Sequence, residues 1–453
     1  MRFFSVLVSF LLLGGVTSAQ QADSLMIRRM ADEILLHGKA YDNLRALTKQ
    51  IGGRLSGSPQ MVCAEQWGLQ VMKESGAEEA WLQACQVPHW VRGGRDAATA
   101  YYGKSARPLA VLALGNSRGT GTRPVRARVI EVDSFEDLER KRDSIRGKIV
   151  FYNYPFNPTF ISTFQAYGDA VRYRGQGASR AAKYGAVAVI IRSMSHSVDN
   201  YPHTGAMYYD SAYAMIPAAA LGLRDADWLS QQLRLGPVSV SLRTNGHFLP
   251  DTTGHNVIGE LRGSEFPDQY ITVGGHLDSW DPAEGAQDDG AGVVQTLEVL
   301  RTLRALGYRP RHSIRFVLFA NEENGLRGGL KYAQEARDRK EKHLFALESD
   351  AGGFTPRGFG FDATDSQMVR IRTWGPLLAP YGGGNLTQGG DGADIGPLHR
   401  LGAVTAGLNP DSQRYFDYHH AASDVLENVN KRELELGAIN MAALIYLVDK
   451  YGL

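Results

Sequence analysis

Histidines and acidic residues recur in short glycine-rich motifs in the second half of the sequence. They are, in chain order, His276 and Asp278 in GGHLDSW, Asp288 in GAQDDGAG, Glu322 and Glu323 in ANEENG, Asp350 in LESDAGG, and His420 in YHHAASD. If these side chains met, the carboxylates would repel one another and lose hydration unless cations lay among them. Mixed imidazole and carboxylate ligands suit zinc, or another borderline divalent metal, better than Mg²⁺ or Ca²⁺. The motifs therefore predict a divalent metal site.

The number of ligands suggests two metal ions. Two ions about 3.5–4 Å apart need a ligand between them, and a carboxylate can bridge them. Asp288 is the best candidate for the bridge, because it lies on a glycine-flanked turn where the backbone can approach closely. We expect His276 and Asp350 to bind one ion, and Glu323 and His420 to bind the other.

Two acidic residues remain for supporting roles. A water held by two cations has a depressed pKa, and a nearby carboxylate can take its proton and pass it to a leaving amine. We expect Glu322 to be this general base. Asp278 lies two residues after His276. We expect its carboxylate to accept the free ring N–H of that histidine and so hold the other ring nitrogen on the metal.

These motifs must be positioned by regular elements, and the pattern around them predicts an α/β fold. The predicted strands are 270–273, 313–319 and 344–347, and the predicted helices are 291–306, 326–337 and 431–451. Strands that alternate with helices indicate a mainly parallel central sheet flanked by helices. In such sheets ligands bind outside the carboxyl ends of the strands, so the metal motifs should converge there.

A second folding unit is expected to interrupt this one. The 453-residue chain is long enough for more than one unit, and the polar, glycine-containing stretch NSRGTGTRP at residues 116–124 resembles a linker. Beyond it we expect an α+β insert with strands at 125–132, 147–154, 186–193 and 239–244, and a long loop rich in Gly and Tyr before a short helix at 179–185. The predicted organisation is a first peptidase-like part at 20–118, an insert at 119–247 and a second part at 248–453.

The first 19 residues are expected to be removed before the protein acts. Arg2 precedes an apolar run from Phe3 to Val16, and small residues follow as far as Ala19. The run is shorter than the roughly 20 apolar residues that span a bilayer, so it indicates a cleavable secretory leader at residues 1–19. We therefore expect a secreted or periplasmic protein without a stable membrane anchor.

Charge and cysteine content bear on the possible binding partners and on disulfide formation. The chain has 49 Lys plus Arg and 48 Asp plus Glu, for a net charge of +1. A near-neutral chain has no general attraction to nucleic acid. Cys63 and Cys85 are the only cysteines. In an oxidising compartment they could form one disulfide, or they could remain as two free thiols.

The motifs resemble those of peptidase family M28, the co-catalytic zinc peptidases, and are most similar to its carboxypeptidase Q branch. The seven residues named above match the family's H-x-D, G-A-x-D-D, E-E, D and H-x-x-x-D signatures, and the spacing to Asp424 selects His420 over His419 as the ligand. The similarity covers nearly the whole mature chain. It implies two zinc ions per chain, the ligands argued above, Glu322 as general base, and exopeptidase activity on dipeptides or short peptides.

The resemblance also identifies the insert as a protease-associated (PA)-like domain, which we expect either to cap the pocket or to mediate a homodimer. This branch often carries a further His shortly after the ligand His, where this chain has Ala422, so substrate preference does not transfer. Asp394 in GGDGADIGPL matches a family loop near the pocket, and it is either a substrate or supporting residue or a helix cap.

Two other functions are compatible with the same scaffold. A glutaminyl cyclase is typically mono-zinc, whereas a bridging Asp288 with both histidines favours two metals. A non-catalytic binding module would lack part of the ligand set, and no ligand is missing here. Zinc content and peptide turnover separate these functions from an exopeptidase.

Overall fold

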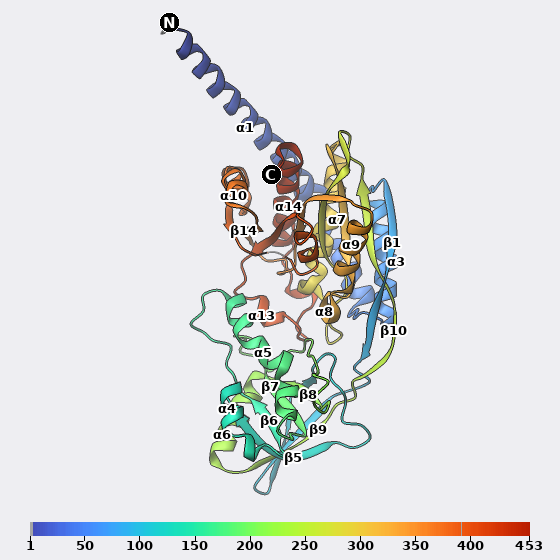
Figure 1. Cartoon of the computed structure of the whole chain (residues 1–453), viewed down its shortest axis with the longest axis vertical. Helices are drawn as coiled ribbons and strands as arrows, with labels where there is room; N and C mark the ends of the chain where they lie inside the picture. Colours follow the sequence, from blue (N-terminus) through green and yellow to red (C-terminus); the bar gives the residue numbers. More distant parts are fainter. Residues whose placement is uncertain (1–2, 391) are drawn as a thin grey trace.

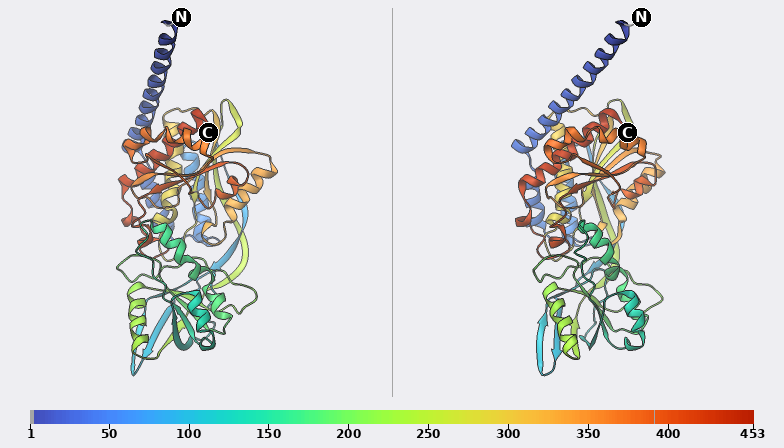
Figure 2. Two further views of the ribbon diagram at one scale, coloured as in Figure 1. Left: turned by 60° about the vertical axis from the view of Figure 1, so that its left-hand side comes forward. Right: turned by 90° about the vertical axis from the view of Figure 1, so that its left-hand side faces the viewer.

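Two units stacked along the long axis make up the molecule, as Figure 1 and the turned views of Figure 2 show. This computed structural model describes residues 3–390 and 392–453, with side chains from residue 20 onward. Each unit is built on an eight-stranded sheet. The upper unit contains both ends of the chain, and the lower unit is formed by the middle of the sequence.

The upper sheet has the strand order β1-β10-β12-β11-β13-β16-β14-β15. Its strands are β1 (Glu79–Val91), β10 (His247–Leu261), β11 (Phe266–His276), β12 (His312–Phe319), β13 (Lys342–Glu348), β14 (Pro356–Asp362), β15 (Asn385–Gln388) and β16 (Val404–Pro410). The central strands β12, β11, β13 and β16 run parallel, while β1, β10 and β14 pair antiparallel at the flanks. The expected α/β fold with a mainly parallel centre is confirmed.

Helices cover both faces of this sheet. They include α2 (Ala40–Ala46), α3 (Pro59–Glu74), α7 (Ala291–Ala305), α9 (Arg327–Asp338) and α14 (Lys431–Tyr451), with the short helices α8 (Glu322–Gly325), α10 (Asp365–Arg372), α11 (Gly375–Leu378), α12 (Gly396–His399) and α13 (Tyr415–Tyr418). The predicted final helix has the same bounds as α14. Its start is set by Asn430, whose side chain accepts hydrogen bonds from the first free backbone N–H groups.

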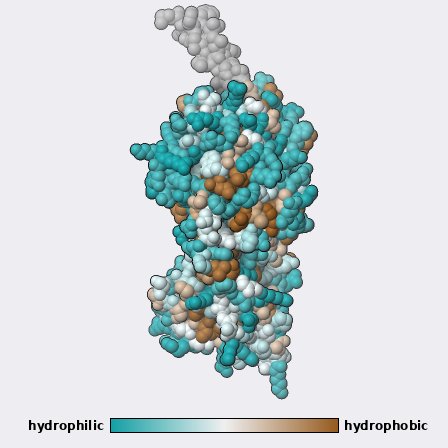
Figure 3. Space-filling model, turned by 90° about the vertical axis from the view of Figure 1, so that its right-hand side faces the viewer, coloured by the Kyte–Doolittle hydropathy of each residue, from teal (hydrophilic) through white to brown (hydrophobic). Residues whose placement is uncertain are grey.

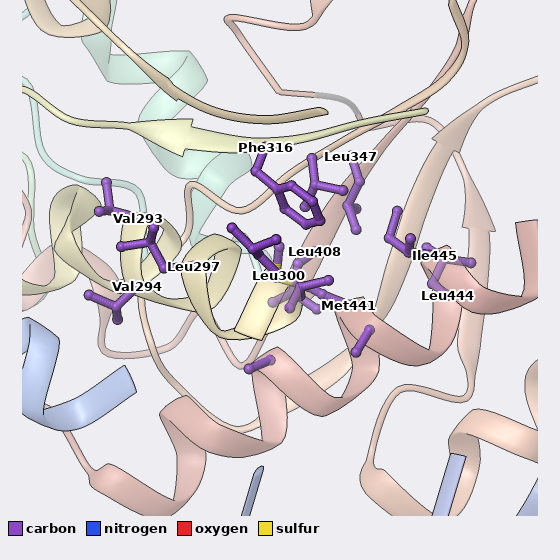
Figure 4. Packing of buried hydrophobic residues seen from close by; sticks show 14 of the residues in the cluster. Val293, Val294, Leu297, Leu300, Phe316, Leu347, Leu408, Met441, Leu444 and Ile445 are labelled. Atoms are coloured by element: carbon purple, nitrogen blue, oxygen red, sulfur yellow. The ribbon is translucent and has the colours of Figure 1, made fainter. Parts of the chain in front are cut away.

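The core of the upper unit lies where α7 and α14 pack against the parallel strands (Figure 4). The figure labels Val293, Val294, Leu297 and Leu300 of α7, Phe316 of β12, Leu347 of β13, Leu408 of β16, and Met441, Leu444 and Ile445 of α14. Each is almost or fully inaccessible to solvent, and such burial is worth about 1.5–3 kcal/mol per side chain. This packing gives the loops at the sheet edge a rigid base.

The lower sheet has the order β3-β2-β9-β5-β6-β7-β8-β4. It contains β2 (Ala97–Tyr102), β3 (Ser105–Leu109), β4 (Val111–Ala113), β5 (Val125–Val132), β6 (Ile149–Tyr152), β7 (Ala188–Arg192), β8 (Ala218–Leu221) and β9 (Val238–Arg243), with helices α4 (Phe135–Arg140), α5 (Thr163–Ala182) and α6 (Leu223–Leu235). The expected boundary at residue 119 cuts through this unit, because β2, β3 and β4 precede that residue and pair within the sheet. The stretch at 116–124 is therefore a loop inside the insert.

The long loop expected before residue 179 was a wrong prediction, because α5 fills most of it. Its buried face includes Tyr173 and Ala178, which pack within the lower unit, and Ala166 and Ala170, which pack in a cluster that includes Phe416 of α13. Gly177 lowers the helix propensity of this segment, but a Cβ there would lie 2.9 Å from the Tyr152 ring. Gly177, which by local sequence alone favours a loop, is therefore explained by packing against Tyr152.

The N-terminal helix α1 (Phe3–His37) packs against α14 and α7 with Ile27, Met30 and Ile34 buried. The predicted leader, residues 1–19, falls outside the residues whose side chains are described. Within the described ranges, no helix has both the length and the apolar character needed to cross a bilayer. Cys63 is exposed and Cys85 is buried, and both are free thiols. The outer face in Figure 3 is largely hydrophilic, with apolar side chains in a few small groups.

Candidate metal centre

The predicted site residues come together at the carboxyl edge of the parallel strands. β11 ends at His276, Glu322 and Glu323 begin the short helix after β12, Asp350 follows β13 by two residues, Asp288 precedes α7, and His420 lies between α13 and α14. Close packing at this edge depends on Gly275, where a Cβ would lie 2.6 Å from Oδ2 of Asp289 and 2.8 Å from the backbone of α7. The glycine lets α7 begin directly against the end of β11.

One half of the cluster is arranged around His276. Its Nε2 lies 3.2 Å from Oδ1 of Asp288 and 3.3 Å from Oδ1 of Asp350. The imidazole is 1% exposed, so these contacts form away from bulk water. These are the three side chains that we grouped around one ion from the sequence, with Asp288 as the shared ligand.

The other half is arranged around His420. Its Nε2 lies 3.0 Å from Oε2 of Glu323 and 3.3 Å from Oδ2 of Asp288. The two oxygens of Asp288 thus face two different histidines, which is the geometry expected of a bridging carboxylate. His419 stacks on His420 but its Nε2 is 3.8 Å from Asp288.

Two compact groups of possible ligand atoms can be drawn from the described residues. One joins Asp288, His419 and His420, and the other joins His276, Asp289 and Asp350, with all atoms in each group within 4.8 Å of one another. Asp289 is already engaged, because its two carboxylate oxygens accept the backbone N–H groups of His276 and Gly292 at 3.0 and 2.9 Å. We therefore assign it a positioning role and keep Asp350 with His276.

Burial and neighbouring charge shift the acid–base properties of the cluster. Burial would raise the pKa of Asp288, but hydrogen bonds from His276 and His420 hold it well below its usual value. Burial raises the pKa of Glu323 to about 7. Burial, opposed by the charge of His276 and reinforced by that of Asp350, raises the pKa of Glu322 well above its ordinary value. The carboxylate of Glu322 therefore holds a proton more readily than an exposed glutamate does.

Asp278 has a different role from the predicted one. The Nδ1–H of His276 donates to the backbone carbonyl of Asp278 at 3.0 Å, while the Asp278 carboxylate is 3.7 Å away. That carboxylate instead accepts the backbone N–H groups of Glu322 and Glu323 at 3.0 and 3.3 Å. The chain turns directly after β11, so the carbonyl reaches the ring first and the side chain is free to position the Glu-Glu pair.

Two positioning residues were not predicted from the sequence. Asp424 accepts the backbone N–H groups of Gln287 and Asp288 at 2.7 and 3.2 Å and so holds the turn of the proposed bridge. Its spacing from His420 matches the H-x-x-x-D signature, but that spacing does not indicate which backbone groups it holds. Arg54, in the turn IGGRLSGSP, is fully buried and donates to the carbonyl oxygens of Leu277, Glu284 and Gly285 at 2.5, 2.8 and 3.1 Å.

A cavity of about 610 Å³ opens onto the cluster between the two units. The upper unit contributes Asp288, Glu322, Glu323, Asp350, His419, His420, Tyr415 and Phe416, and the insert contributes Phe164, Tyr167, Val171, Arg174, Ala206 and Tyr208. Rings of α5 and α13 pack together, with Tyr167 and Phe416 stacked at 4.9 Å. The insert therefore forms one wall of the cavity, as Figure 1 shows for α5 beside α13.

Arg174 is the basic side chain of the insert that faces this acidic cavity. Its guanidinium donates to the Tyr167 hydroxyl at 2.6 Å and to the carbonyls of Ala206 and Thr204 at 3.3 and 3.5 Å, and it lies 3.4 Å from Nδ1 of His420. It has no ion pair with any carboxylate of the described residues. The side chain is 7% exposed. A buried cation without an acidic partner suits an anionic group supplied by a ligand.

The sequence and the fold both match known peptidases. The sequence pattern of Peptidase family M28 matches residues 256–445. Carboxypeptidase Q of Homo sapiens is 34% identical, over 92% of this chain and 87% of the relative. The chain belongs to peptidase family M28. A peptidase M28 precursor from Shewanella amazonensis has 32% identity and a TM-score of 0.90, covering 95% of this chain and 97% of that one. A zinc aminopeptidase from Bacillus subtilis shares the fold at 21% identity, with a TM-score of 0.65 and 90% of this chain covered.

Membership in the family makes this chain a zinc-dependent metallopeptidase, and its donor set fits zinc. Bonds of about 2.0–2.1 Å in tetrahedral geometry place two ligand atoms about 3.3 Å apart. The separations of 3.0–3.3 Å between the histidine nitrogens and the facing carboxylates agree with that spacing. Oδ2 of Asp288 is buried without a well-formed hydrogen bond from any described residue, as expected of an oxygen that serves a metal.

Proposed function

We propose that this protein is a di-zinc exopeptidase that hydrolyses dipeptides or short peptides. The observation that carries the proposal is that the two oxygens of Asp288 face Nε2 of His276 and Nε2 of His420, at 3.2 and 3.3 Å. Asp350 would complete the ligands of one ion and Glu323 those of the other. A mono-zinc site would not need a carboxylate between two imidazoles.

The side chains around the proposed zinc pair have complementary tasks. Bound zinc would act as a Lewis acid on the peptide carbonyl and lower the pKa of water. Glu322 lines the cavity beside the ligands, takes a proton from the attacking water and passes it to the leaving amine. Asp278 holds Glu322 and Glu323 through their backbone N–H groups, so the base and the ligand keep a fixed spacing.

The cavity supports a small substrate with a free carboxylate. Its volume of about 610 Å³ lies within the range of about 300–1,000 Å³ that is usual for small-ligand pockets. Arg174 supplies for the carboxylate a guanidinium that has no acidic partner among the described residues, and this charge enters from the insert. The name of the carboxypeptidase Q relatives is consistent with such an end-directed site. The insert would thus set the length of peptide that fits.

The setting of the enzyme is proposed from the sequence. Residues 1–19 would act as a cleavable leader that directs the protein to a secreted or periplasmic location. The insert, which we propose is a PA-like domain, would cap the cavity that its residues line, and its outer faces would be available to mediate a homodimer. Analytical ultracentrifugation of the mature chain would test the dimer.

The adjacent pair Glu322 and Glu323 offers a matched test. Glu322→Gln should keep two zinc ions per chain and lose turnover of dipeptides by about 10²–10⁴-fold, because it removes only the proton acceptor. Glu323→Gln should lose zinc as well as activity, because it removes a ligand. Zinc is counted by atomic emission and turnover by release of free amino acid. Full turnover by Glu322→Gln would contradict the assignment of the base, and one zinc ion per fully loaded wild-type chain would favour a cyclase-like site.

A further inference from the structure

His419 lines the active-site cavity although none of the assignments above uses it. Its ring stacks on His420 with the centroids 3.5 Å apart and the planes at 19°. Its Nε2 is 3.8 Å from Oδ2 of Asp288, and no hydrogen bond joins the ring to any residue that the structure describes. A polar ring that is 7% exposed and unpaired at the edge of a reaction cavity calls for an explanation.

The ring is held firmly in this position. Tyr167 of the insert packs edge-on against it at 5.0 Å, and Phe416 and Tyr415 lie at 5.1 and 5.3 Å. The backbone carbonyl of His419 accepts from Nδ1 of His203 at 2.8 Å. Aromatic rings from both units thus enclose the imidazole, and the hydrogen bond from His203 fixes its backbone. Little reorganisation would be needed for its N–H to meet a ligand.

The geometry separates His419 from the metal ligands. His420 places Nε2 3.0 Å from Glu323 and 3.3 Å from Asp288, so it has two anionic ligands as neighbours. His419 has only the longer 3.8 Å approach to Asp288, and no ion pair to Glu323 is found for it among the described residues. Its ring therefore lies beside the ligand set, where the substrate rather than the ion would be in reach.

We infer that His419 is an additional catalytic residue, whose ring N–H donates a hydrogen bond to the carbonyl oxygen of the scissile peptide as negative charge develops there. The inference rests on the proposed peptidase function. An imidazole carries at least one N–H in either protonation state, so it is a donor in both. A preorganised donor in a site shielded from water stabilises the transition state more than the ground state, and its loss typically costs about 10²–10³-fold in kcat.

Three variants test this role. His419→Leu removes the donor and keeps the volume, and we expect kcat for dipeptides to fall by about 10²-fold or more while KM changes little. His419→Gln places an amide N–H near the same position and should recover part of the loss. His399→Gln is the matched control, because His399 is a partly exposed imidazole on α12, which is not among the elements that line the cavity.

Two further measurements exclude a merely structural role. Zinc content should stay equal to that of the wild type in both His419 variants. Affinity for a phosphinic dipeptide analogue, measured by calorimetry, should fall in His419→Leu by about the same factor as kcat, because the analogue carries the tetrahedral oxygens. If His419→Leu does not fold, His419→Gln still reports through the ratio of kcat loss to KM change.

The outcomes separate the inference from the function that underlies it. Loss of zinc in His419→Leu would make the residue a ligand and overturn the inference. Unchanged kcat in His419→Leu, or equal loss of kcat in His419→Leu and His419→Gln, with an active wild type, would also overturn it while leaving the peptidase assignment intact. A zinc-loaded wild type that cleaves no dipeptide would instead reject the proposed function itself.

Discussion

Arg174→Met is the perturbation that most directly tests how the substrate is held. Methionine keeps most of the length and apolar volume of the side chain while removing the guanidinium. The Tyr167 hydroxyl, the carbonyls of Thr204 and Ala206 and Nδ1 of His420 lose a neighbour, but the cavity lies beside Tyr167, Ala206 and His420, and water can replace the guanidinium there. Because His420 is a proposed zinc ligand, the zinc content of the variant is measured as well, and it should equal that of the wild type. The change therefore addresses ligand binding more than folding.

The expected size follows from the contacts that Arg174 can offer. A hydrogen bond between a charged donor and a carboxylate contributes about 1.5–3 kcal/mol, and a guanidinium can make two at once. The present bonds to neutral oxygens offset part of this gain. A net loss of about 2–4 kcal/mol corresponds to about 30- to 1,000-fold in kcat/KM. Most of it should fall on KM, because the carboxylate is held equally before and during reaction.

The assay compares dipeptides that have a free carboxylate with the same dipeptides as C-terminal amides. Wild-type enzyme should prefer the free acids by the factor given above, and Arg174→Met should hydrolyse both forms at similar, low efficiency. Arg172→Met serves as the control, because Arg172 lies on the same helix but is exposed and outside the cavity lining.

A retained preference for free acids in Arg174→Met would refute this reasoning. The carboxylate would then be read by another group, and the buried guanidinium would have only a structural role. Equal loss of activity in Arg172→Met would point to damage of α5 rather than to substrate recognition.

Three further outcomes can be checked on purified protein. Arg54→Met should lower the free energy of unfolding by about 3–5 kcal/mol and weaken zinc binding, because it leaves three carbonyls, two of them buried, without this donor. Chemical denaturation and a chelator competition measure the two effects, and unchanged zinc affinity would contradict the positioning role. Burial alone would raise the pKa of Glu341, but hydrogen bonds from His343 and Arg315 outweigh burial and lower that pKa from 4.5 to about 2. The ionised Glu341 therefore stabilises the fold above about pH 5, and this stabilisation is lost as pH falls toward 2. The difference in unfolding free energy between wild type and Glu341→Gln, about 3 kcal/mol at neutral pH, should close over that range in urea titrations. Removal of the metal with a chelator should lower the unfolding temperature more at about pH 8 than at about pH 5.5. Metal-free carboxylates with raised pKa values, such as Glu323 at about 7, lose their protons as pH rises, and buried charged carboxylates without a metal destabilise the fold. An equal decrease at both pH values would argue against the buried acid cluster.

Much of the site could be predicted because its signals are local. Strand ends, glycine turns and acidic residues follow one another in order, and a parallel sheet brings its carboxyl ends to one edge. His276, Asp288, Glu323, Asp350 and His420 therefore meet where the sequence placed them. Which chemical group makes each contact was not accessible in this way. The carbonyl and the carboxylate of one aspartate compete for the same imidazole, and only the path of the turn decides between them.

The cavity wall was missed for a related reason. Tyr167, Val171 and Arg174 follow the spacing of one helix face, but the glycines at 168, 175 and 177 favour a loop. One of those glycines is required by a contact with Tyr152, which is distant in sequence. If the segment is predicted to be a loop, the sequence gives no indication of where the side chain of Arg174 points. Local sequence patterns mispredict secondary structure where a residue type is required by a contact with a residue distant in sequence.

The pairing of β1 with β10 has a consequence for the history and engineering of this chain. The two strands run side by side from the upper unit to the insert, and Val91 lies opposite His247 at their far end. The whole insert thus connects the far ends of β1 and β10, where a simple hairpin would have a turn. Replacing residues 92–246 by a tight turn would restore an uninterrupted ribbon and yield a smaller hydrolase with an uncovered cleft. Exchange of that segment between homologues would in turn transplant selectivity as one cassette, if the contacts that His203, Thr204 and Arg174 make with His419 and His420 are retained.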